Sequence, residues 1–145
     1  MRLPSALPIL ILVLAVPSHT TPAESPAEIV SSQVESAFRS AMEAWAYEQY
    51  WKLWEMGTNL ERLRVTQNDF SDRMRAGLTR PVAGRQIEAM AVQVNSLESA
   101  MVLARITIDR RHLQRQEVVS RSFLFKFEDG SWRIVLYDFQ ALAGY

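Results

Sequence analysis

The sequence predicts an α+β fold in which helices come first and an antiparallel sheet follows. Two observations carry this prediction. Up to about residue 77, apolar residues recur every three or four positions, which is the period of an amphipathic helix. From about residue 85 they alternate, which is the period of a strand with one buried face. Short turns join the consecutive alternating runs, so we expect hairpins instead of parallel crossovers.

Length and composition indicate one globular domain. The chain has 145 residues, 48% of them hydrophobic, with sixteen acidic and sixteen basic groups. Basic residues form no large excess of the kind that neutralises phosphates, so nucleic acid is not an expected partner. The absence of cysteine excludes disulfides, a thiol nucleophile and a cysteine-ligated metal.

The N-terminal residues have the pattern of an export signal. Arg2 supplies an early positive charge, and residues 6–16 form an apolar run that small and polar residues follow. The run is shorter than the roughly 20 residues that a membrane span needs. Cleavage is expected after Ser18 or Ala23, and retention of the run as an anchor is the alternative.

This pattern sets the predicted organisation and location. Residues 1–23 are predicted as signal peptide and cleavage region, residues 24–27 as a linker and residues 28–145 as a single domain. The protein is expected to be exported, to the periplasm or out of the cell. Contact with a membrane is expected only if the signal segment is retained.

A long helix is predicted to begin directly after the linker. Ser25 can cap it, Pro26 suits its first position, and Glu28 can complete a reciprocal capping box. Helical spacing predicts the following core-facing residues: Val30, Val34, Phe38, Ala41 or Met42, and Trp45.

Two shorter helices are expected next. Aromatic residues continue a helical spacing as far as Gly57, a suitable left-handed helix end: Tyr47, Tyr50, Trp51 and Trp54. A third helix is predicted from a cap at Thr66 to about Gly77, with Phe70 and Met74 as its apolar stripe.

The alternating runs predict strands over residues 87–94, 98–109, 113–128 and 132–139. Asp129-Gly130, between the last two, is the strongest hairpin signal in the chain. A symmetric turn there predicts four facing pairs: Phe127 with Trp132, Phe125 with Ile134, Phe123 with Leu136, and Arg121 with Asp138. The last pair would be an ion pair that lowers the pKa of Asp138.

With these elements the chain resembles the nuclear transport factor 2-like superfamily, which includes SnoaL-like cyclases and ketosteroid isomerases, and it would be an exported bacterial member. The long first helix, the helices over residues 45–54 and 66–74, and the aromatic closing hairpin over residues 123–136 carry the resemblance. It spans residues 28–145. It implies a cystatin-like cone, with helices in the concave face of a curved sheet, a pocket at the wide end, and dimers formed through the outer sheet face.

The expected pocket has aromatic walls and a few polar groups. Its predicted lining is Tyr47, Tyr50, Trp54, Phe123, Phe125, Arg121 and Asp138. An isomerase site of this superfamily needs a carboxylate base and oxyanion donors, but the acid-bearing strand expected after the second helix is missing over residues 57–61. Asp138, with Tyr50 or Tyr137 assisting, is a candidate for the base.

No reaction signature stands out elsewhere in the sequence. His19 and His112 lack the spacing of a metal site, so neither metal nor cofactor is expected. The arginines near residues 105–115 are either a solvated loop or a surface for an acidic partner or lipid headgroups. On the predicted strand over residues 98–109, Met101 and Leu103 face away from the core and suggest burial in a dimer.

The leading hypothesis is an exported, non-catalytic domain that binds a small apolar or amphipathic ligand or a partner protein, as a homodimer. An isomerase or cyclase using Asp138 as base is one alternative. A membrane-anchored scaffold component, with residues 6–16 retained as the anchor, is the other.

Overall fold

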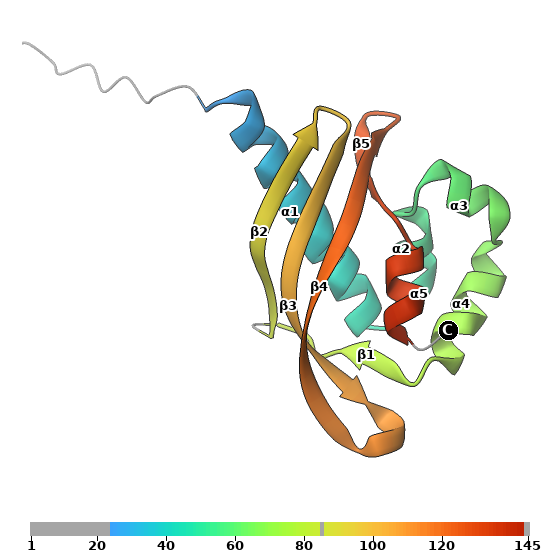
Figure 1. Ribbon diagram of the computed structural model, residues 1–145. Coiled ribbons are helices and arrows are strands. Elements are labelled where there is room, and N and C mark those ends of the chain that lie inside the picture. The colour runs from blue at the N-terminus through green and yellow to red at the C-terminus, as the bar shows by residue number, and fades with distance from the viewer. Residues whose placement is uncertain (1–23, 85, 144–145) are drawn as a thin grey trace, which may run out of the picture.

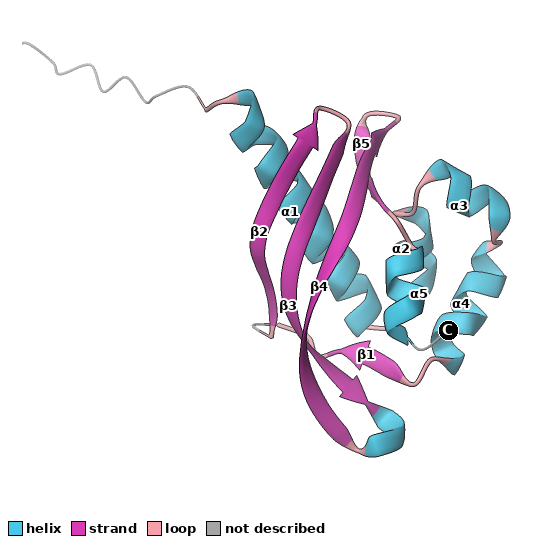
Figure 2. Cartoon of the chain, in the orientation of Figure 1, coloured by secondary structure: helices cyan, strands magenta, loops and turns pink. Residues whose placement is uncertain are grey.

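Helices fill the first half of the described chain and strands most of the second (Figures 1 and 2). The computed structural model describes residues 24–84 and 86–143, so the predicted signal peptide lies outside the described residues. The elements are α1 Pro26–Ala46, α2 Tyr50–Glu55, α3 Asn59–Arg64, α4 Gln67–Ala76, β1 Thr79–Pro81, β2 Ile87–Ser96, β3 Ser99–Arg110, η1 Arg111–Leu113, β4 Arg115–Glu128, β5 Ser131–Ile134 and α5 Tyr137–Ala143. No helix among them is long and apolar enough to cross a membrane.

The predicted α+β fold is confirmed. The antiparallel sheet is strongly curled, and α1 crosses one of its faces (Figure 1). β3 is central: β4 runs along one edge from Ser99–Lys126 to Arg110–Arg115, while β2 and the short β1 share the other edge. A register shift between Ala89 and Ala91 leaves one extra residue in β2, and such bulges increase the local twist of a sheet.

α1 begins and packs as predicted. The Ser25 N–H donates to Glu28 Oε2 at 2.7 Å, and the Glu28 N–H donates to Ser25 Oγ at 3.3 Å. This reciprocal box satisfies N–H groups that the helix itself leaves without acceptors. Every residue predicted for its core face is buried: Val30, Val34, Phe38, Ala41, Met42 and Trp45.

The left-handed residue between the first helices is Glu48, with φ 58°, so the expectation for Gly57 was wrong. The Glu48 carboxylate accepts hydrogen bonds from Arg111 of η1 and, at 3.2 Å, from Arg80 of β1. The Arg111 hydrogen bond holds the pKa of Glu48 below its ordinary value. These hydrogen bonds hold the turn after α1 against β1 and against η1, which follows β3.

Gly57 allows a close approach of two chain segments instead. It forms a parallel bridge with Ile134, whose N–H donates to Met56 O at 2.9 Å and whose carbonyl accepts from the Thr58 N–H at 3.2 Å. A Cβ at Gly57 would lie 2.5 Å from Leu136 Cδ1. α3, which was not predicted from the sequence, begins directly after this contact.

The final hairpin agrees with the prediction as far as Ile134. Asp129 (φ 51°) and Gly130 (φ 76°) are both left-handed, as a symmetric two-residue turn requires, and Phe127 faces Trp132 while Phe125 faces Ile134. Beyond Ile134 the predicted strand is wrong, because the chain leaves the sheet and forms α5. The pairs Phe123–Leu136 and Arg121–Asp138 therefore do not form in the sheet.

Glu61 explains where α5 starts. Its carboxylate accepts hydrogen bonds from the backbone N–H groups of Leu136 at 2.9 Å and Tyr137 at 3.0 Å, and from the Thr58 hydroxyl at 2.8 Å. A carboxylate at a helix N-terminus satisfies free N–H groups and complements the helix dipole. This acceptor lies 75 positions away in the sequence, which is why local alternation suggested a strand.

Candidate functional site

Aromatic side chains fill the inner face of the sheet. The Phe139 ring of α5 lies 5.3 Å from Trp45 and 5.3 Å from Phe123, and Phe38 lies 5.5 Å from Phe123. All four side chains are fully buried. A close-packed interior leaves little free volume. The chain after β5 forms α5 instead of the predicted strand, and α5 packs against this face of the sheet.

The structure separates the aromatic residues predicted to line a pocket. Tyr47 is 64% exposed, whereas Tyr50 and Phe125 belong to the buried core. Burial raises the pKa of the Tyr50 hydroxyl. Trp54 is partly buried, and its indole N–H donates to the Val65 carbonyl at 2.8 Å. The Arg62 guanidinium lies over its ring, 5.8 Å from the centroid.

Three predicted lining residues do come together. Arg121, Phe123 and Asp138 line one cavity of about 260 Å³ between β4 and α5. The predicted ion pair is wrong, since no salt bridge joins Arg121 to Asp138 among the described residues. Because Asp138 lies in the first turn of α5, its carboxylate instead accepts a hydrogen bond from the Leu124 backbone N–H at 3.3 Å.

This change reverses the expected pKa shift of Asp138. Burial raises its pKa above the ordinary value, while the Leu124 hydrogen bond lowers it and the charge of Glu61 raises it. The carboxyl group therefore binds a proton more readily than a free aspartate. It also continues the hydrogen bonding of β4 beyond the point where β5 ends.

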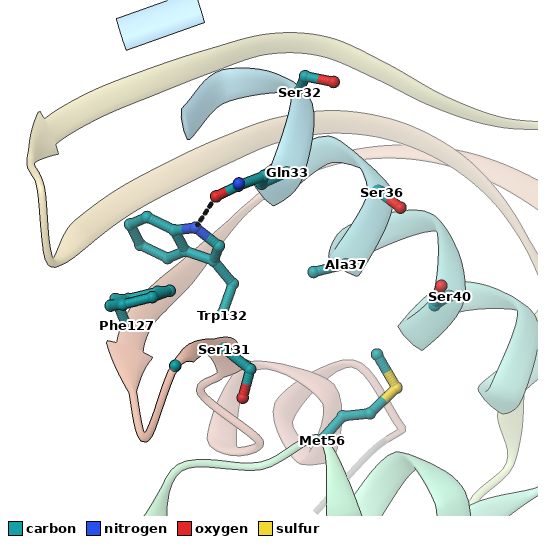
Figure 3. A pocket seen from close by; sticks show the side chains of 10 residues that line it. Ser32, Gln33, Ser36, Ala37, Ser40, Met56, Phe127, Ser131 and Trp132 are labelled. Carbon is teal, nitrogen blue, oxygen red and sulfur yellow. Dashed lines mark hydrogen bonds between the residues drawn. The ribbon is translucent and has the colours of Figure 1, made fainter. Parts of the chain in front are cut away.

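A larger open groove of about 590 Å³ lies between α1 and the β4–β5 hairpin (Figure 3). α1 supplies one wall of small and polar side chains, and the hairpin with Met56 supplies the other. The lining is Ser32, Gln33, Ser36, Ala37, Ser40, Met56, Phe127, Gly130, Ser131 and Trp132. None of these ten residues is charged.

The aromatic wall of the groove is held in place from both sides. The Trp132 indole N–H donates to Gln33 Oε1 at 3.3 Å (Figure 3). The ring of Phe127 lies 5.3 Å from that of Trp132 at 56°, a tilted arrangement that aromatic pairs favour. Trp132 is only 8% exposed, but Phe127 is 40% exposed and remains open to contact.

The hairpin tip is anchored to α3. The Asn59 backbone N–H donates to Glu128 Oε2 at 2.7 Å, and its side-chain amide donates to Asp129 Oδ2 at 2.8 Å. Arg133 Nη1 donates to the Glu55 carbonyl at 2.6 Å. These contacts fix the hairpin relative to the helices, so both walls of the groove are in position before any ligand arrives.

The groove was not predicted from the sequence, although part of its pattern was present there. Ser32, Ser36 and Ser40 recur every four residues on α1, opposite the predicted apolar face. Only the register of the hairpin could have shown that Phe127 and Trp132 lie across from them. Serines on an exposed helix face otherwise indicate nothing beyond solvation.

The arginines near residues 105–115 are largely neutralised by acidic partners. Arg110 and Arg115 both contact Glu117, at 2.6 and 3.8 Å, and Arg105 lies 3.8 Å from Glu88. In the described part of the chain, no group of three or more His, Cys, Asp or Glu side chains is placed to hold a metal ion. No known family model matches the chain, and no curated protein sequence matches it significantly.

Proposed function

We propose that this protein binds a small amphipathic ligand in the groove between α1 and the β4–β5 hairpin. The observation that carries the proposal is a preformed groove with uncharged polar groups on one wall and aromatic rings on the other. Its volume of about 590 Å³ lies within the range of roughly 300–1,000 Å³ that small-molecule sites occupy. The anchored hairpin supports it further, because a preorganised site loses less entropy on binding.

The protein is further proposed to be exported, to form a homodimer and to belong to a known superfamily. An export signal in residues 1–23 and the partly apolar outer face of β3 support an exported homodimer. The helices packed on a curled antiparallel sheet support membership of the nuclear transport factor 2-like superfamily as a divergent branch. Mass spectrometry of the protein recovered from cells would show a new N-terminus after Ser18 or Ala23. An intact N-terminus in the membrane fraction would favour the anchored scaffold instead.

Binding can be tested on the full-length, ¹⁵N-labelled protein with a library of small uncharged compounds. Amide shifts should gather at Gln33, Ser36 and Trp132 and should saturate with concentration. Ser36→Trp, which fills the groove, should weaken binding at least tenfold, whereas Lys52→Trp on the exposed side of α2 should leave it unchanged. No saturable shift at the groove with any compound would overturn the proposal.

A second function is favoured by the cavity that Asp138 shares with Arg121. A carboxyl group whose pKa is raised by burial and that lines a cavity of about 260 Å³ is suited to take up and return a proton. An isomerase using it should convert a β,γ-unsaturated ketone to its conjugated isomer. Asp138→Asn would abolish that turnover without unfolding the protein. Absence of turnover in the unmodified protein would leave Asp138 with its contact to β4 alone.

A further inference from the structure

The residues that line the groove limit the classes of compound that can bind there, and we propose that the ligand is a neutral carbohydrate. This inference rests on the ligand-binding function proposed above. The ten residues that line the groove carry no charge. Charged side chains line an adjoining hollow that shares the serines of α1, where Glu35 and Arg39 form an ion pair at 2.7 Å. An ionic ligand would lose its hydration without gaining a counter-charge, which is unfavourable. A neutral ligand is therefore favoured over an acid, a phosphate or an amine.

The polar wall argues against a purely apolar ligand. Ser36 and Ser40 of α1 present hydroxyl groups along the groove, and Ser131 of β5 adds a hydroxyl that donates to the Glu128 carbonyl at 3.4 Å and keeps its acceptor positions. Each hydroxyl can donate one hydrogen bond and accept two. A lipid or hydrocarbon chain would cover these groups without satisfying them, and buried polar groups without partners are costly. A ligand that carries its own hydroxyl groups avoids this cost.

Gln33 adds a directed donor to the same wall. Its Oε1 atom is engaged by the Trp132 indole N–H at 3.3 Å, which fixes the orientation of the amide. The amide nitrogen is then the part of the side chain left to donate to a ligand. An oriented amide next to flexible hydroxyls suits the closely spaced donors and acceptors of a sugar ring.

The opposite wall fits the apolar face of such a ring. Phe127 exposes 40% of its surface beside the buried Trp132, and Met56 extends the wall with a flexible apolar side chain (Figure 3). A sugar ring has C–H groups on its faces and hydroxyls at its edges. A sugar ring stacked on the Phe127 side chain would direct its C–H groups to Phe127 and its hydroxyl groups to α1.

The test is a titration of the full-length protein with cellotriose, maltotriose and triacetylchitotriose, followed by tryptophan fluorescence and calorimetry. At least one trisaccharide should give saturable heat and a fluorescence change. Trp132→Phe should abolish the fluorescence change and weaken binding at least tenfold, because it removes the indole and its bond to Gln33. Trp51→Phe, which changes an exposed indole of α2 outside the groove lining, should alter neither.

Three further ligands separate the outcomes. Trigalacturonate, the charged counterpart, should bind at least tenfold more weakly than the best neutral sugar. A saturable response only to trigalacturonate, only to a neutral Ser/Leu peptide or only to an uncharged non-sugar compound would overturn the carbohydrate proposal while leaving a ligand-binding groove. If no compound gave saturable heat or a fluorescence change, the proposed ligand-binding function itself would be overturned.

Discussion

A single carboxylate shows how a change of local structure changes chemistry. As a strand residue, Asp138 would face Arg121 and remain ionised to low pH. In the first turn of α5 it accepts the Leu124 N–H at 3.3 Å, and burial raises its pKa. The same residue thus changes from one half of an expected ion pair to a group that compensates for the early end of β5. This environment is also what the alternative enzymatic function would need.

The raised pKa of Asp138 predicts how stability depends on pH. The ordinary pKa is 3.8, so between pH 3.8 and the raised value the folded state binds more protons than the unfolded state. Stability contributed by this group therefore falls as pH rises through that window. In urea unfolding at several pH values, wild-type stability relative to Asp138→Asn should decrease across the window. Parallel pH profiles for the two proteins would contradict this.

The asparagine variant keeps the acceptor for the Leu124 N–H, so a second variant isolates the hydrogen bond. Asp138→Ala should cost about 0.5–1.5 kcal/mol of unfolding free energy near neutral pH, the usual net value of one hydrogen bond. Asp138→Asn should cost less under the same conditions. Equal losses in both variants would mean that the contact with β4 contributes little.

At the scale of elements, local sequence signals predicted structure well. Two features, α5 and the groove, depend on contacts between distant residues and were not predicted. The capping box at Ser25 and Glu28 and the turn at Asp129-Gly130 depend on adjacent residues, and both form as predicted. α5 depends on Glu61, far away in the sequence. The groove depends on a hairpin that α3 holds against α1. Such pairings leave no trace in local periodicity.

Gly57 lets the chain after α2 lie close to the end of β5, because it has no side chain to meet Leu136. Gly57→Ala should destabilise the protein by about 1–3 kcal/mol, because overpacking forces neighbouring atoms to move and the new Cβ would lie 2.5 Å from Leu136 Cδ1. Urea unfolding measures the loss. Repeating the substitution in a Leu136→Ala background should reduce it, because the clashing side chain is gone. An equal loss in both backgrounds would place the strain at the Trp54 carbonyl, 3.0 Å from that Cβ.

At the scale of the whole molecule, the return of α5 moves the working surface outward. Phe139 closes the aromatic core between Trp45 and Phe123, and an open groove of about 590 Å³ lies beside α1. A packed interior and a preformed surface groove are compatible with tight ligand binding, since neither has to rearrange. The smaller cavity at Asp138 keeps a titratable group next to the core, as does the hollow that Glu61 lines with Phe70 and Leu136.

The outer face of the sheet carries the last prediction. Met101 faces Leu124 across β3 and β4, and neighbouring Leu103 is 39% exposed. Apolar residues gathered on an outer face commonly mark an interface, and a two-fold dimer would bring this face against its copy. Leu103→Glu would place a charge in that interface and should raise the dimer dissociation constant at least tenfold, or about 1.4 kcal/mol.

Sedimentation velocity over a range of concentrations measures this dissociation constant. Leu97→Glu is the matched control, because Leu97 is 70% exposed in the β2–β3 turn, at one end of the sheet. It should leave association unchanged. A protein that stays monomeric at every concentration would exclude the sheet-to-sheet dimer. A dimer that Leu103→Glu does not weaken would place the interface on another face, where the groove beside α1 would be the first surface to examine.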